Sequence, residues 1–156
     1  MASNLSLNQF APNTPLDGMY VYMANEGQLH NVIVGEDTTL KAGDLVTLDD
    51  TSTNTNAPVV VAFNSSNPNG IPFGVVSYNP IKSSYTTGER VGLARDFDVI
   101  WKTANRAIPV GAPIIFDANN KVGVSSGSTK LIEGIALTPA SDDGDLIQVE
   151  LRIMAG

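Results

Sequence analysis

The chain of 156 residues has no cysteine, one histidine and one tryptophan, and each scarcity narrows its possible chemistry. Without cysteine, disulfides and thiolate metal sites are excluded. Any catalytic arrangement built on a histidine base would have to use His30. This residue stands in the apolar stretch "HNVIV", which is expected to be a strand, and no obvious nucleophile lies beside it. We therefore interpret His30 as a surface or strand-face histidine rather than a base.

Basic residues are also scarce. Nine Lys and Arg face sixteen Asp and Glu, which gives a net charge of −7, and the basic residues are scattered from Lys41 to Arg152. A surface that binds nucleic acid requires clustered Lys and Arg to neutralise phosphates. We therefore expect no nucleic-acid partner. An acidic surface instead favours solubility and mutual repulsion outside a dedicated contact face.

Long apolar runs and helical periodicity are both missing. No run approaches the roughly 20 residues of a membrane-spanning helix, so no membrane partner is expected. The first residues have neither the basic region nor the apolar core of a signal peptide. Nine prolines and fourteen glycines separate short β-branched runs. This composition predicts an all-β chain with many turns, and residues 145–153 show the clearest strand alternation.

A short sequence pattern recurs at the turns between the expected strands. A glycine followed by large apolar residues three and five positions later occurs at Gly43, Gly88, Gly111 and Gly144. A spacing of two places both apolar residues on one face of a strand. Each glycine is therefore predicted to form the turn that leads into a half-buried strand.

Similar patterns also follow one another in the same order in the two halves of the chain. The correspondence pairs Gly43 with Gly111, Gly74 with Gly134, and Gly88 with Gly144. It defines an internal repeat of about residues 40–96 and 108–152. A duplicated three-strand unit that closes into a single compact β-barrel or sandwich-like domain is the simplest account. We assign residues 18–156 to this domain.

Residues 1–17 are predicted to form an extended N-terminal arm, because they are rich in Asn and contain two prolines. Leu5, Leu7 and Phe10 are apolar residues in this polar segment and require burial, so they are candidate anchors into a neighbouring protein. The alternative is a frayed terminus. Trp101 is a fourth candidate interface residue. At the end of a strand it would pack in the core or at the rim, or serve as an anchor in an oligomer.

No motif for catalysis or for a cofactor is found. The acidic group Asp142, Asp143 and Asp145 is closest to a metal motif, but an EF-hand loop would place a closing Glu where Ile153 stands. It is predicted to be a turn, with a loosely held surface ion as the lesser alternative. The segment "SSGSTK" lacks the spacing of a phosphate-binding loop. We expect no catalytic, cofactor or metal residue and no enzyme activity, with a trimeric dUTPase as a remote alternative.

Four segments carry a resemblance to a known family: "AGDLVTLDD", "IPFGVVSYN", "TTGERVGLARDFDVIWKTANRAIPVGAPIIFD" and "LIEGIALTPASDDGDLIQVEL". Their order, over roughly Leu40 to Leu151, resembles the structural cement, or decoration, proteins of tailed-phage capsids. The resemblance implies a β-barrel-like domain made in the host cytoplasm. Such a domain assembles, commonly as a homotrimer, on the capsid exterior and clamps neighbouring major capsid protein subunits. The segment "WKTANRAIPVG" is bulkier than the alanine-rich family pattern, so contact residues are not transferred.

A different structural role is the main alternative. In a head fibre or receptor-binding module, the polar loops at 51–57 and 64–70 would contact a host glycan. Glycan sites usually combine exposed aromatic side chains with polar groups. These loops contain no aromatic residue, which favours the cement interpretation.

Overall fold

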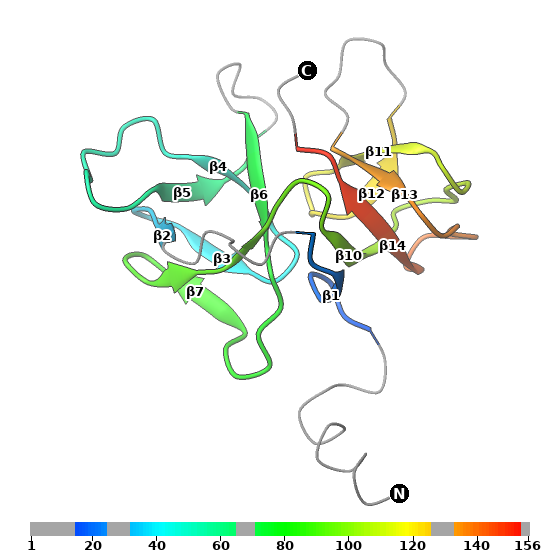
Figure 1. Ribbon diagram of the computed structural model, residues 1–156, viewed down its shortest axis with the longest axis horizontal. Coiled ribbons are helices and arrows are strands. Elements are labelled where there is room, and N and C mark those ends of the chain that lie inside the picture. The colour runs from blue at the N-terminus through cyan, green and yellow to red at the C-terminus, as the bar shows by residue number, and fades with distance from the viewer. Residues whose placement is uncertain (1–14, 25–31, 65–70, 126–132, 154–156) are drawn as a thin grey trace, which may run out of the picture.

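The computed structural model describes residues 15–24, 32–64, 71–125 and 133–153, and these form a compact all-β domain (Figure 1). The described residues contain fourteen strands and no helix. His30 lies outside them. The strands are β1 (Tyr20–Tyr22), β2 (Val32–Val34), β3 (Thr39–Lys41), β4 (Leu45–Leu48), β5 (Val59–Ala62), β6 (Pro72–Val76), β7 (Ser84–Thr86), β8 (Arg90–Val91), β9 (Leu93–Ala94), β10 (Val99–Thr103), β11 (Pro113–Phe116), β12 (Val122–Val124), β13 (Gly134–Ala136) and β14 (Leu146–Leu151).

The first sheet has the strand order β8-β2-β5-β4-β6-β9. Only Gly92 separates β8 from β9, so the two ends of this sheet meet and it closes into a small barrel. Its interior is filled by β-branched and other apolar side chains, which strands place on one face at every second residue. They are Val32, Val34, Leu40, Val46, Val60, Val76, Tyr85, Val91 and Leu93. The short β3–β7 pair contributes Leu40 and Tyr85 to this cluster.

The second sheet has the order β1-β10-β14-β13-β11-β12, with antiparallel pairing throughout. A parallel bridge from Ala104 to Val122 brings the end of β10 to β12, so this sheet is also nearly closed. In Figure 1 these strands form one side of the domain, while β2, β4 and β5 form the other. The predicted alternation in β14 is confirmed, because Ile147, Val149 and Leu151 are all buried.

The two sheets repeat one strand order. β5-β4-β6-β9 in the first sheet matches β12-β11-β13-β14 in the second. The turns before β4 and β11 also make matching bonds: the Gly43 N–H donates to the Val76 carbonyl at 2.8 Å, and the Gly111 N–H to the Ala136 carbonyl at 2.7 Å. The four turn glycines Gly43, Gly88, Gly111 and Gly144 have φ between 83° and 94°. Their predicted role as turn residues is confirmed, since glycine adopts this conformation without steric cost.

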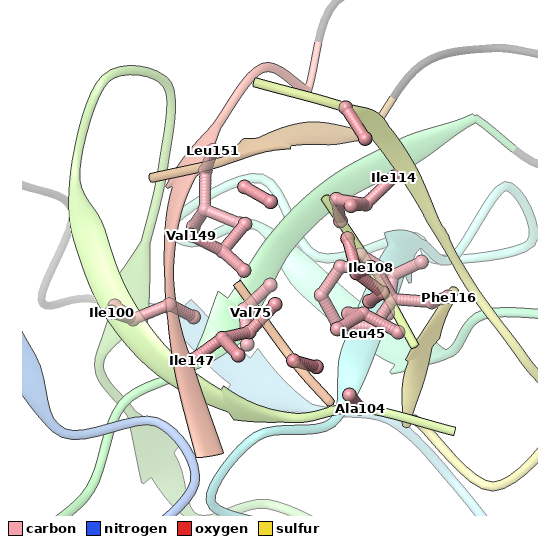
Figure 2. Close-up of a cluster of buried hydrophobic side chains, with 14 of the residues drawn as sticks. Leu45, Val75, Ile100, Ala104, Ile108, Ile114, Phe116, Ile147, Val149 and Leu151 are labelled. Atoms are coloured by element: carbon pink, nitrogen blue, oxygen red, sulfur yellow. The ribbon is translucent and has the colours of Figure 1, made fainter. Parts of the chain in front are cut away.

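One hydrophobic core spans both halves. Leu45, Val75 and Ala94 come from the first sheet but pack with the buried residues of the second. Figure 2 shows Leu45 and Val75 among side chains of the second half, including Phe116 and Ile147. Burying large aliphatic side chains contributes about 1.5–3 kcal/mol each, so this shared core stabilises the two sheets against each other.

β13 and β14 approach each other closely at Gly134. A Cβ at this position would lie 2.8 Å from Val149 Cγ1 and 2.9 Å from the Glu150 carbonyl oxygen. We expect Gly134→Ala to lower the free energy of unfolding by about 1–3 kcal/mol through overpacking. Urea denaturation followed by tryptophan fluorescence measures this loss.

Gly92→Ala is the matched control. Its Cβ would meet only the Ser77 Oγ, at 3.1 Å, and this side-chain hydroxyl donates to the Gly92 carbonyl. Its expected cost is below about 1 kcal/mol. Equal losses in the two variants would contradict the close-approach argument.

Candidate protein-binding surface

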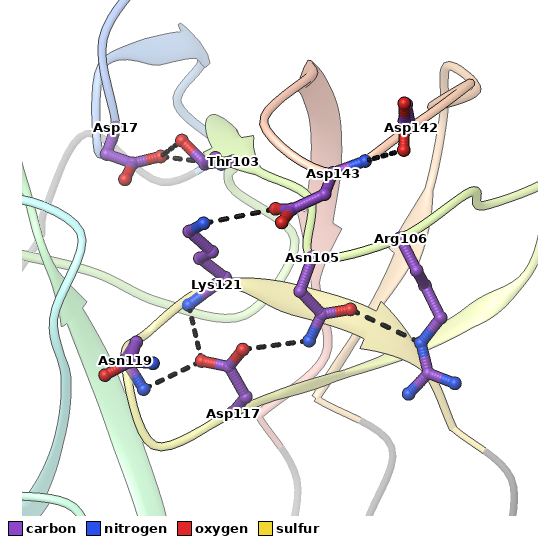
Figure 3. Close-up of polar contacts among 9 residues, drawn as sticks. All are labelled: Asp17, Thr103, Asn105, Arg106, Asp117, Asn119, Lys121, Asp142 and Asp143. Carbon is purple, nitrogen blue, oxygen red and sulfur yellow. Dashed lines mark hydrogen bonds and ion pairs between the residues drawn. The ribbon is translucent and has the colours of Figure 1, made fainter.

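The described residues contain no group of three or more His, Cys, Asp or Glu side chains that could hold a metal ion. Asp142, Asp143 and Asp145 form a turn, as predicted: the Asp145 carboxylate accepts the N–H of Ser141 at 2.8 Å and of Asp142 at 3.1 Å. Asp143 pairs with Lys121 at 3.1 Å (Figure 3). In the part of the chain that the structure describes, no helix is long and apolar enough to cross a membrane.

Lys102 is the most unusual charged group, because its side chain is completely buried. Its Nζ donates to the Gly43 carbonyl at 2.8 Å, lies 3.8 Å from Asp17 Oδ1 and sits 5.2 Å from the centre of the Phe116 ring. Burial lowers the pKa of Lys102, and the nearby carboxylates of Asp17 and Asp44 oppose this shift. A buried ammonium with these partners links β10 to the turn before β4.

Asp44 extends this link to the second half. It is only 8% exposed, and its carboxylate accepts the Lys41 N–H at 2.9 Å and the Asn120 side-chain amide at 3.2 Å. The Asn120 Oδ1 in turn accepts the Leu45 N–H at 2.9 Å. Burial raises the pKa of Asp44, although the hydrogen bond from Lys41 and the charges of Lys41 and Lys102 act against it. These buried polar groups face one another inside the domain, so we interpret them as structural.

The start of the described chain is tied to β10. Asp17 Oδ1 accepts the Thr103 N–H at 2.7 Å and its hydroxyl at 2.9 Å (Figure 3). The Gly18 N–H donates to the Trp101 carbonyl, and the Trp101 N–H donates to the Met19 carbonyl, both at 2.9 Å. The arm residues Leu5, Leu7 and Phe10 lie outside the described residues. The described residues 17–19 lie along β10.

Trp101 is half-buried on the outer face of the second sheet. Its neighbours Ile100 and Lys102 are fully buried, so Trp101 points the opposite way, and Gln148 lies across from it on β14. It is therefore a rim residue rather than a core residue. Its role at an interface stays a prediction.

An exposed apolar surface lies along β1, which is an edge strand of the second sheet. Val21 is 43% exposed, Tyr22 61% and Met23 37%. Phe97, which is 46% exposed, is close by, because Tyr22 lies opposite Val99 and the Ala24 N–H donates to Asp98 Oδ1 at 2.8 Å. We name Val21, Tyr22, Met23 and Phe97 the β1 edge patch.

Sequence reasoning missed this patch. The run "MYVYMA" indicated a strand, but nothing in it distinguished an edge strand from a central one. Exposed apolar groups gathered at one edge are typical of protein-binding surfaces, especially when they include aromatic side chains. A groove of about 460 Å³ lies where the described chain begins, and Leu16, Tyr78 and Ile81 contribute to its walls.

The all-β fold, the polar groups closed inside it and the exposed apolar edge define a domain suited to binding other proteins. Residues 24–153 match the family model of the phage cement protein, so the chain belongs to this family. It is a structural protein of the bacteriophage head. No curated protein matches the sequence.

A solved structure, "The crystal structure of head fiber gp8.5 N base in bacteriophage phi29", shares the fold with a TM-score of 0.53. The two sequences are 14% identical, and the match covers 78% of this chain and 91% of that one. At this identity the likeness concerns the fold alone.

Replacing Lys102 tests its structural role. We expect Lys102→Met to lower the free energy of unfolding by about 3–5 kcal/mol, because the Gly43 carbonyl would lose its buried donor and Asp17 and Asp44 would lose the nearby positive charge. Urea denaturation measures the change. Thr103→Val, which removes one partly exposed hydrogen bond to Asp17, is the control and should cost about 1 kcal/mol. A Lys102→Met variant as stable as the wild type would show that desolvation outweighs the contacts.

Glu89 should make the domain sensitive to acid. Its ion pair with Lys82 and its hydrogen bonds from Thr86 lower the pKa of Glu89 from 4.5 to about 2. Because the folded-state pKa is the lower one, this carboxylate stabilises the fold above pH 4.5, and the contribution disappears as the pH falls toward 2. We expect Glu89→Gln to be less stable than the wild type at pH 7 and equal to it near pH 2 in thermal melts. A constant difference across this range would contradict the prediction.

Proposed function

We propose that this chain is a cement protein that binds the exterior of a phage head and clamps neighbouring major capsid protein subunits. The observation that carries the proposal is the β1 edge patch, an exposed apolar surface at the edge of a rigid β domain. Membership of the phage cement protein family supplies the capsid as partner. Attachment would then rest on buried apolar area, multiplied over many copies by the symmetry of the shell.

The charge distribution supports attachment through one face. A net charge of −7 keeps copies apart elsewhere, while the β1 edge patch itself contains no acidic side chain. Charged residues are depleted from the centres of protein interfaces, where apolar and aromatic side chains are favoured. A homo-oligomer, a trimer in particular, would present this face several times and strengthen binding through avidity.

The N-terminal arm and Trp101 extend the proposed contact. Residues 17–19 bond to Thr103 and to the backbone of Trp101, so the C-terminal end of the arm lies along the edge of β10. Leu5, Leu7 and Phe10 would bind a neighbouring subunit, and Trp101 would pack at the rim. A truncation that tests the arm should begin after residue 14, because Asp17 contacts Lys102 and Thr103.

Binding to isolated heads tests the proposal. Heads without the protein are mixed with the purified chain, and bound protein is measured by co-sedimentation, together with the temperature at which the heads release DNA. We expect the wild type to bind and to raise this temperature. Tyr22→Ser should weaken binding at least tenfold, which corresponds to about 1.4 kcal/mol.

Val110→Ser is the matched control, since Val110 is 63% exposed and Tyr22 is 61% exposed. It should bind like the wild type. Removal of residues 2–14 should leave the melting temperature unchanged and weaken binding. Wild-type protein that neither binds heads nor protects them would refute the cement proposal.

A glycan-binding role is the second candidate. A polar hollow of about 460 Å³ is lined in part by Asp49, Thr51 and Asn54, within or beside the loop at 51–57. Sugars bind through such hydroxyl, amide and carboxylate groups, usually together with an aromatic ring. A glycan-array signal that is lost in Asn54→Ala, without head binding, would favour this role. Light scattering should accompany both tests, because a concentration-independent monomer would count against the trimer.

A further inference from the structure

Phe97 occupies a backbone position that the same chain fills with glycine elsewhere. Six of the described turns have one form, in which the N–H of the fourth residue donates to the carbonyl of the first and the third residue has positive φ. Their nitrogen-to-oxygen distances lie between 3.0 and 3.3 Å. The third residues are Gly18, Gly43, Gly88, Phe97, Gly111 and Gly144, and Phe97 has φ 71°.

A phenylalanine is poorly suited to this conformation. At positive φ the Cβ of an L residue crowds the backbone, so bulky residues are rare there and glycine is favoured. The other turns show that the chain accommodates glycine at this point without difficulty. Backbone strain of this kind persists where the surrounding structure imposes it, and it gathers at binding sites.

The ring of Phe97 is not compensated by burial. Its side chain belongs to neither core cluster, and the residue is 46% exposed. Its described partner is the Arg152 guanidinium, which lies 4.7 Å from the ring centre and is itself 38% exposed. A stack this exposed contributes about as little as a surface contact. Folding therefore gives no reason for an aromatic residue at this position.

The surroundings fix the backbone of this turn. Asp98 is fully buried, and its two carboxylate oxygens accept the Arg95 N–H at 2.9 Å and the Ala24 N–H at 2.8 Å. The first bond closes the turn, and the second ties it to the end of β1. Because the backbone that carries Phe97 is already ordered, a partner that binds the ring does not have to order this turn.

We propose that Phe97 is the aromatic anchor of the β1 edge patch and inserts its ring into an apolar pocket of a capsid subunit. This inference rests on the proposed function. Membership of the phage cement protein family supplies the capsid as the occupant of this patch. The Arg152 guanidinium beside the ring is paired with Glu150 at 2.9 Å, so it adds little net charge to the contact. A second copy of this chain is the alternative occupant, which the oligomeric state tests.

The decisive variant is Phe97→Gly, which removes the ring and relieves the backbone. We expect its melting temperature to stay equal or rise by up to about 4 °C, while its affinity for heads falls at least tenfold. Phe97→Asn, which also tolerates positive φ, should behave in the same way and excludes an effect of glycine flexibility. A melting temperature that falls in both variants would show a packing role and overturn the inference.

Gly144→Ala measures the backbone cost alone. Its φ is 94°, and an added Cβ would meet nothing within 4 Å. Its melting temperature should fall by a few degrees while head binding stays unchanged. An unchanged melting temperature would mean that positive φ costs this turn nothing, which would remove the strain argument.

The outcomes for binding separate the two proposals. If the wild type binds heads and both Phe97 variants bind equally well, the anchor is refuted and the cement function stands. If the wild type does not bind heads, both are refuted. Light scattering of the same variants tests the second copy: an oligomer that dissociates in Phe97→Gly would make this chain the partner and overturn the capsid pocket.

Discussion

The buried ammonium group of Lys102 is the interaction on which the rest of the structure depends. It comes from β10 in the second sheet and donates to the carbonyl of Gly43, in the turn that starts β4 of the first sheet. Asp44 and Asn120 bond across the same junction. A buried cation is tolerated only with such partners, so the position of each half is specified by the other. Leu45 and Phe116 of the shared apolar core lie beside this polar contact.

Left-handed glycine turns allow the two halves to use one strand order. Each turn directs the chain into a strand whose apolar side chains fill a small barrel, and the same donor–acceptor pairs recur in both halves. Phe97 stands in one of these turns without the freedom of glycine. Natural proteins retain such local conflicts mainly where function requires them. The positive φ of Phe97 is therefore the reason for proposing a binding role for the surface beside β1.

The domain combines a well-packed interior with an exposed apolar edge at β1. In the part of the chain that the structure describes, every buried side-chain nitrogen and oxygen atom has a hydrogen-bond partner. Outside, the edge strand β1 exposes Val21 and Tyr22, and the chain as a whole carries a net charge of −7.

The sequence by itself determined the all-β class, the turn glycines and the alternation of β14, because these depend on residue type and spacing over a few positions. It also supplied the family resemblance. It identified Trp101 as a candidate but not its place at the rim, and it gave no sign of the exposed edge at Tyr22, the burial of Lys102 or the strained backbone of Phe97. Only the tertiary structure decided these. Burial, edge position and backbone strain arise from contacts between residues far apart in the chain, and no local pattern encodes them.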